Sequence, residues 1–153
     1  MGKTRGIDYL KARKIDFEIL EYDHQVKGAE FAAKALKVPL EQMIKTIVLK
    51  DDQKNYYFCC LPGNKEIPLK SISRQTGIKK LEISSFQEAE KITGYLVGGI
   101  SPFGSKKHLP VFLDQELQSY EFVYINGGKR GVILKLEFPD LFSELNPQLV
   151  EIA

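Results

Sequence analysis

Lys45 is the first residue whose position suggests chemistry. It stands at the start of a β-branched, apolar run over residues 44–50 that predicts a strand. The alternation of a strand would place Lys45 and Ile47 on one face and Thr46 on the other. A lysine on an apolar face is costly to bury unless an anion or a carbonyl oxygen meets its ammonium group. The pattern therefore leaves two interpretations, an anion- or carbonyl-binding lysine and a strand-end lysine that extends to solvent.

A glycine-rich but apolar stretch, residues 94–104, is the second candidate. It holds four glycines and one proline among bulky apolar residues. Gly98 and Gly99 leave backbone N–H groups accessible, and such groups can bind a phosphate, a carboxylate or a developing oxyanion. The alternative is a tight crossing of two chain segments, which also needs small residues. The stretch is neither GxGxxG nor a Walker loop, so we expect no nucleotide cofactor.

Four cations form a third candidate. Lys129 and Arg130 lie at the tip of a predicted hairpin, and Lys106 and Lys107 follow the glycine-rich stretch. Together they could bind a phosphate backbone, or they could simply be solvated. The net charge of the whole chain is only +2, which argues against extensive wrapping of nucleic acid.

The other reactive side chains give weaker signals. Cys59 and Cys60 are adjacent, so a disulfide between them would be strained, and their apolar surroundings predict reduced residues in a core strand. The only histidines are His24 and His108, and there is no CxxC, so we expect no metal site. Ser101 lacks the GxSxG context of a hydrolase nucleophile.

The order of predicted elements indicates a single α/β (α+β) domain, residues 1–153. Ser85 and Glu88 have the spacing of a helix capping box. Because strands recur in hairpins with helices between them, the sheet should be mixed and largely antiparallel. Helices are expected at 3–14, 28–37, 68–76, 85–92 and 139–145. Strands are expected at 16–22, 44–50, 56–61, 81–83, 110–113, 121–125, 132–136 and 149–152.

Composition places the chain among ordinary globular proteins. Hydrophobic residues make up 43% and charged residues 27% of the 153 positions, which is enough to build one core. No apolar run approaches the roughly 20 residues of a membrane helix. The charged N-terminal segment has no signal-peptide pattern, and with the reduced cysteines it predicts a cytoplasmic protein.

Taken together, Lys45-Thr46, the 94–104 stretch and the 127–131 hairpin resemble the YbaK/prolyl-tRNA-synthetase-associated editing domains. The resemblance covers nearly the whole chain and is greatest for the free-standing branch, described as Cys-tRNA(Pro)/Cys-tRNA(Cys) deacylases. It implies a sheet curled into an incomplete barrel with surrounding helices.

The function that this resemblance implies is hydrolysis of the ester of mischarged aminoacyl-tRNA, above all Cys-tRNA(Pro). In the cysteine-clearing branch the substrate thiol is thought to attack its own ester carbonyl, while the alanine-clearing branch uses the tRNA 2′-OH and a water. The protein then supplies positioning and electrostatics. The implied partners are the 3′ end of mischarged tRNA and prolyl-tRNA synthetase, without a membrane, a metal or a cofactor.

The resemblance also implies roles for individual residues. Lys45, ordinarily cationic at neutral pH, would hold the 3′-terminal nucleotide. Gly98 and Gly99 would present N–H groups to the aminoacyl carbonyl, and Tyr22 matches a family tyrosine that lines the pocket. Further pocket-wall residues are Thr46, Ile100, Ser101 and Pro102; those expected at the tRNA acceptor end are Lys106, Lys107, Lys129 and Arg130.

Two positions differ from the family pattern, and the glycine-rich stretch by itself allows one further interpretation, an esterase or a phosphate-binding protein. Relatives often carry serine at Asn126 and an acidic residue at Ile133. If that carboxylate selects the amino group of the substrate, specificity differs here. The alternatives are an Ala-tRNA(Pro) deacylase, a non-catalytic tRNA- or synthetase-binding module of the same fold, and a small-molecule esterase or phosphate-binding protein.

Overall fold

The computed structural model describes residues 4–23 and 29–153. The α-helices in these ranges are α1 (Arg5–Ala12), α2 (Ala29–Leu36), α3 (Leu69–Thr76), α4 (Phe86–Thr93) and α5 (Phe138–Leu145). The strands are β1 (Glu18–Glu21), β2 (Ile44–Lys50), β3 (Tyr56–Pro62), β4 (Glu82–Ile83), β5 (Val111–Asp114), β6 (Phe122–Asn126), β7 (Val132–Glu137) and β8 (Gln148–Val150). Short 3-10 helices cover Leu40–Gln42 (η1) and Gln115–Ser119 (η2).

The strands form two sheets. One is antiparallel in the order β1-β7-β6, and the other is mixed in the order β4-β2-β3-β5-β8, where β3, β5 and β8 are parallel. A single isolated bridge between Met43 and Tyr124 links them in the described part of the chain. The expectation of a mixed α/β fold is therefore confirmed, but the strands divide between two sheets, and those described do not close a barrel.

Local sequence signals explain where several elements begin and end. Ser85 and Glu88 form the expected capping box at the start of α4, which ends at Gly94 with a φ of 80°. Gly77 ends α3 in the same left-handed conformation. The η2 turn was not expected. It is capped by Asp114, whose side chain accepts a hydrogen bond from the Glu116 N–H.

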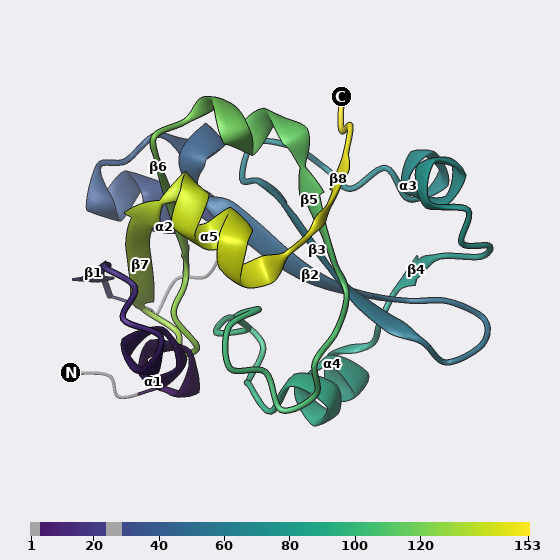
Figure 1. The fold of residues 1–153 in the computed structure, drawn as a ribbon, viewed down its shortest axis with the longest axis horizontal. Coiled ribbons are helices and arrows are strands. Elements are labelled where there is room, and N and C mark those ends of the chain that lie inside the picture. The colour runs from purple at the N-terminus through teal and green to yellow at the C-terminus, as the bar shows by residue number, and fades with distance from the viewer. Residues whose placement is uncertain (1–3, 24–28) are drawn as a thin grey trace.

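The helices cover both sheets and divide the core into three clusters. In Figure 1, α5 lies in front of the strands, α3 lies at the right near the turn of the β2–β3 hairpin, and α4 lies at the bottom. The largest cluster packs α1 and α5 against both sheets. A second lies between α3 and the five-stranded sheet, and a third lies between α2 and the three-stranded sheet.

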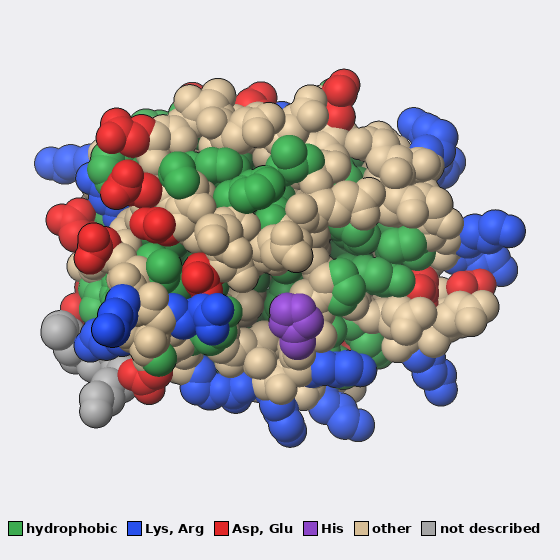
Figure 2. Space-filling model, viewed as in Figure 1, with side chains coloured by type: hydrophobic (Ala, Val, Ile, Leu, Met, Phe, Trp, Pro, Cys, Tyr) green, Lys and Arg blue, Asp and Glu red, His purple; other side chains and the backbone are tan. Residues whose placement is uncertain are grey.

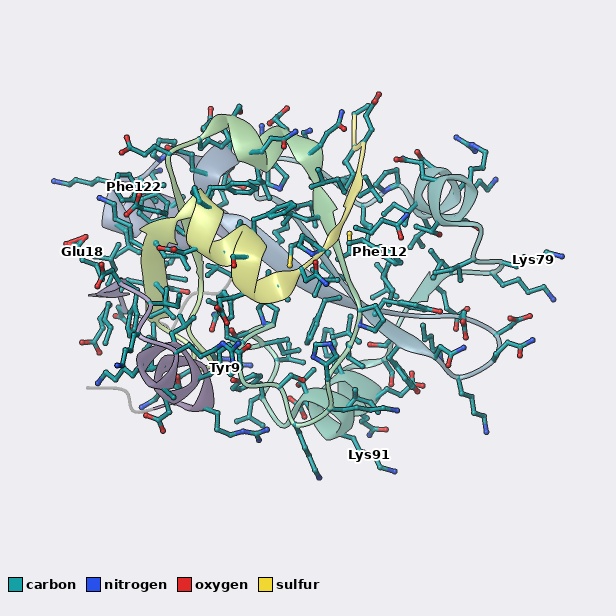
Figure 3. The ribbon with its side chains drawn as sticks, viewed as in Figure 1. Tyr9, Glu18, Lys79, Lys91, Phe112 and Phe122 are labelled. Atoms are coloured by element: carbon teal, nitrogen blue, oxygen red, sulfur yellow. The ribbon has the colours of Figure 1, made fainter. Side chains whose placement is uncertain are left out.

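The second cluster shows how the strands of the larger sheet are packed. Phe112 of β5 stacks on Tyr57 of β3, with ring centroids 5.4 Å apart (Figure 3). Cys59 and Cys60 are both fully buried and unbonded, which confirms the prediction of reduced core-strand cysteines. Of the helices that the structure describes, none is long and apolar enough to cross a membrane.

Candidate active site

The main cavity lies at the seam between the two sheets. Its volume is about 340 Å³, near the lower end of the range for small-molecule sites. The inner wall is apolar and comes from α2, β2 and β7. The residues that line the cavity are Tyr22, Ala29, Ala32, Met43, Ile44, Lys45, Thr46, Ile47, Val48, Ile83, Ser84, Phe86, Ala89, Val97, Gly98, Ile100, Asn126 and Ile133.

One wall of the cavity is the edge of β2. β4 pairs with β2 only at Leu49 and Lys50, and the Ser84 N–H donates to the Val48 carbonyl, 3.0 Å away. Because backbone groups in an antiparallel strand alternate in direction, the N–H and C=O of Thr46 point the same way as those of Val48. They therefore face the cavity, where the described strands leave them without a ladder partner. This edge offers one donor and one acceptor to a bound molecule.

Lys45 lines the cavity and is half-buried on β2. It pairs across the hairpin with Leu61, and its ammonium group donates to the carbonyl oxygen of Lys65. The Lys65 side chain is itself held by the buried Asp114, at 2.8 Å. An ammonium has three N–H donors. Lys45 therefore does not simply extend to solvent, because its ammonium group is bonded to a backbone carbonyl of the chain itself.

Gly98 lies at the cavity mouth in a conformation that favours glycine. Its φ is 93°, and a Cβ there would lie 2.5 Å from Nε of Arg130. The Gly98 carbonyl accepts a hydrogen bond of 2.8 Å from the Asn126 amide. The Gly98 N–H has no acceptor within residues 4–23 and 29–153. This glycine therefore combines close approach of a cation with an unused donor at the cavity.

Gly99 is placed differently, and one expectation has to be corrected. Its N–H donates to the Leu96 carbonyl at 2.9 Å, so it does not point to a ligand. A Cβ on Gly99 would lie 2.8 Å from the Lys129 Cα. Gly99 is buried and does not line the cavity. The tight crossing of two chain segments is the correct interpretation at this glycine.

Ser101 and Pro102 also lie outside the cavity wall. Ser101 is fully buried, and its hydroxyl accepts a hydrogen bond of 3.1 Å from the Phe103 N–H. Pro102 lines a second, smaller cavity beside Tyr9 and Glu144. The expectation that both residues form the pocket wall is not met, because the chain turns inward after Ile100 to pack against α1.

The expected basic residues divide between two places. Arg130 lies at the cavity mouth, where its Nε donates to the Val97 carbonyl at 2.8 Å. Lys106 and Lys107 are exposed and lie beside the end of α4. Their backbone N–H groups donate to carbonyls of its last turn. Lys129 is exposed on the hairpin. Figure 2 shows many Lys and Arg side chains along the edge of the molecule where α1 and α4 lie.

The cavity wall has few groups that titrate. Lys45 and Tyr22 are its only ionisable residues in the described part of the chain, and burial raises the pKa of Tyr22. Cys60 lies behind the wall, with its Sγ 4.0 Å from the Thr46 hydroxyl, and burial raises the pKa of its thiol to about 12. A thiolate nucleophile is thus not available. His24 lies outside the described residues.

Some site residues could not be singled out from sequence. Ala29 and Ala32 form part of the inner wall, and the alanine-rich face of their helix is the signal that points to close packing there. Asn126 connects Gly98 to the hairpin. Its amide nitrogen donates to the Gly98 carbonyl, and its amide oxygen accepts from the Gly128 N–H. Among the side chains described, no group of three His, Cys, Asp or Glu residues could hold a metal ion.

The fold and the cavity together define a class. The described residues form an α+β fold with a small apolar cavity at the seam of two sheets and a glycine-rich loop at its mouth. The chain belongs to the aminoacyl-tRNA editing domain family, whose sequence pattern matches residues 23–143.

Individual relatives support this membership. EbsC of Enterococcus faecalis, named as a candidate Cys-tRNA(Pro)/Cys-tRNA(Cys) deacylase, is 32% identical over 155 residues, covering 99% of this chain and 93% of that protein. A proline–tRNA ligase of Brachyspira hyodysenteriae is 26% identical over 95 residues, which are 62% of this chain but 16% of the ligase. The crystal structure of a candidate trans-editing enzyme for prolyl-tRNA synthetase superposes with a TM-score of 0.88 at 23% identity, covering 97% of this chain and 94% of that one.

Proposed function

We propose that this protein hydrolyses the ester bond of mischarged aminoacyl-tRNA in trans, with Cys-tRNA(Pro) as its main substrate. The observation that carries the proposal is the cavity itself, which gathers Lys45, Thr46 and Gly98 from distant parts of a chain in the editing family. The similarity to EbsC over nearly its whole length supports cysteine as the amino acid removed.

The polar groups of the cavity suit an ester more than a charged side chain. The Gly98 N–H and the Thr46 N–H are donors for the ester carbonyl oxygen, on which negative charge develops during attack. Lys45 binds the 3′-terminal nucleotide through its remaining N–H donors. Ala32, Met43 and Ile133 form an apolar end that admits a small aminoacyl side chain. An aminoacyl side chain that carries a carboxylate or an ammonium group would be costly to bury there.

The reaction that fits these walls uses the substrate as its own nucleophile. The thiol sulfur of the cysteinyl group bonds to its ester carbon, the bond from that carbon to the ribose oxygen breaks, and the thiol proton goes to the departing ribose oxygen. The thioester ring so formed is then opened by water. The protein holds the reacting atoms in contact, which alone can contribute a large part of the rate. This route is consistent with a cavity wall whose described residues include no carboxylate or imidazole.

The assay that tests this function is release of labelled amino acid from Cys-, Ala- and Pro-tRNA(Pro). We expect fast release of cysteine, slower release of alanine and none of proline. Release of alanine at the same rate as cysteine would exclude attack by the substrate thiol, because alanine has none. If all three remain intact while the protein still binds tRNA, the non-catalytic binding module is the better description.

Lys45→Ala tests the most specific residue assignment. Loss of a charge-assisted hydrogen bond should lower kcat/KM by about 10- to 100-fold without loss of the fold. The matched control is Lys79→Ala, because Lys79 is an exposed lysine that projects away from the molecule (Figure 3). Equal activity of the two variants would remove Lys45 from the site.

A synthetase partner and a cytoplasmic location complete the proposal. The similarity to a segment of a proline–tRNA ligase supports an association with that enzyme. A free-standing domain would act on tRNA that the synthetase releases. Gel filtration of the protein with purified prolyl-tRNA synthetase and tRNA(Pro) should give a joint peak; separate elution under all conditions would mean that it works alone.

A further inference from the structure

The mouth of the cavity carries an exposed apolar rim, defined here as Ile83, Phe86 and Leu96. Their exposed fractions are 50%, 72% and 72%. Ile83 and Phe86 line the cavity, and Leu96 adjoins the lining residue Val97. In the described parts of the chain only one other large apolar side chain, Phe142, is exposed, at 37%. Three exposed apolar residues at one opening indicate a surface that contacts something.

Phe86 is exposed because of the cavity and not because it lies on the solvent side of its helix. It is three residues before Ala89 and seven before Thr93, which are the buried residues of α4. This spacing places Phe86 on the helix face that is turned to the protein. Its ring remains uncovered because the cavity opens beneath the first turn of α4.

Resting on the proposed function, we infer that Phe86 is a stacking platform for an unpaired base at the 3′ end of the tRNA. Proteins bind single-stranded nucleic acid by stacking bases on exposed aromatic rings beside cationic groups. The cavity is small, so it holds the aminoacyl group and leaves a base at the mouth. Ile83 and Leu96 extend the apolar surface around the ring.

Charged groups of both signs surround this rim. Glu82 and Glu88 are paired with Lys50, and Glu90 accepts from the Val97 N–H, while the cations lie at the mouth and at the far end of α4. Arg130 lies at the mouth through its hydrogen bond to Val97. At the far end of α4, Lys91 lies in the last turn, and Lys106 and Lys107 adjoin it. The start of α4 therefore carries an aromatic ring, and its end carries Lys91 beside Lys106 and Lys107, which suits a base at one end and phosphates at the other.

The absence of tryptophan from the sequence allows a direct binding test. Phe86→Trp introduces a single fluorophore, and a single-stranded oligonucleotide that ends in CCA serves as the probe. We expect saturable quenching of the Phe86→Trp emission, because the base stacks on the indole. The matched control is Phe142→Trp on α5, outside the cavity wall, whose emission should not change. Equal responses of the two variants would overturn the inference.

Kinetics separate stacking from simple apolar packing. Phe86→Ala and Phe86→Leu should each raise KM for aminoacyl-tRNA by about 10-fold with little change in kcat, while Phe86→Tyr retains the KM of the natural protein. If leucine serves as well as phenylalanine, the ring does not stack on a base.

The outcomes for the inference and for the proposed function are distinct. An unchanged KM of Phe86→Ala for aminoacyl-tRNA, beside an active natural protein, would reject the platform and keep the deacylase. An inactive natural protein whose Phe86→Trp variant is still quenched by the oligonucleotide would reject the deacylase and keep the platform. A dimer of the natural protein that Phe86→Ala dissociates, seen by sedimentation, would show that a second copy covers the rim and would also overturn the inference.

Discussion

Gly98 and Gly99 are adjacent, but they serve opposite sides of the same loop. Gly98 is exposed at the cavity mouth, with a φ of 93° and an unused N–H among the described residues. Gly99 is buried against the backbone of Lys129, and its N–H closes a turn to Leu96. The first glycine provides access for a ligand and a cation, and the second allows two chain segments to cross. One glycine pair can therefore carry binding and architecture at once.

The largest effect that would test this comparison is expected for Gly99→Ala. The new Cβ would lie 2.8 Å from the Lys129 Cα and 3.0 Å from the Arg130 nitrogen. Backbone atoms cannot rotate away, so we expect a loss of about 3 kcal/mol in the free energy of unfolding. Urea titration followed by circular dichroism measures it. A variant as stable as the natural protein would mean that the crossing has room for a side chain.

Gly98→Ala should damage activity more than stability. The atoms nearest to its Cβ would all belong to the flexible side chain of Arg130, and the left-handed conformation should cost about 1–2 kcal/mol. The matched control is Gly77→Ala, which has a φ of 76° and no neighbouring atom within 4 Å. We expect similar melting temperatures for the two variants, but a kcat/KM about 10-fold lower only for Gly98→Ala, because Arg130 is displaced. Full activity of Gly98→Ala would remove Gly98 from the site.

Ser101→Ala should have the smallest effect and should affect stability alone. It removes the buried hydroxyl that accepts from the Phe103 N–H, a loss of about 1 kcal/mol in the free energy of unfolding. The rate per folded molecule should be unchanged, because Ser101 does not line the cavity. Ser119→Ala, at an exposed serine, is the control for stability. A fall in kcat for Ser101→Ala would mean that Ser101 contributes to the reaction after all.

The sequence predicts the framework of the site well because local patterns determine it. The β-branched run at 44–50 is a strand with the expected bounds, and α4 has its capping box and its glycine end. The alternation that places Lys45 opposite Thr46 is also present, since their cross-strand partners, Leu61 and Cys60, belong to different core clusters. These features depend on residues that are close in the sequence.

The remaining features depend on contacts between distant segments. Whether a glycine approaches a ligand or a backbone is decided by the hairpin some thirty positions later, so sequence alone could not separate Gly98 from Gly99. The backbone donor of Thr46 faces the cavity only because β4 is too short to cover the β2 edge. Phe86 has the spacing of a buried residue, and its exposure follows from an opening that other elements create.

The isolated bridge between Met43 and Tyr124 has a consequence for how the cavity opening can vary. Among the described residues this is the one backbone bridge between the two sheets, and the other strand pairings lie within one sheet or the other. Residues along the seam, such as Ala32 and Ile133, can change in size without disrupting either ladder. Single substitutions at these positions can therefore widen or narrow the opening while both sheets keep their strand pairing.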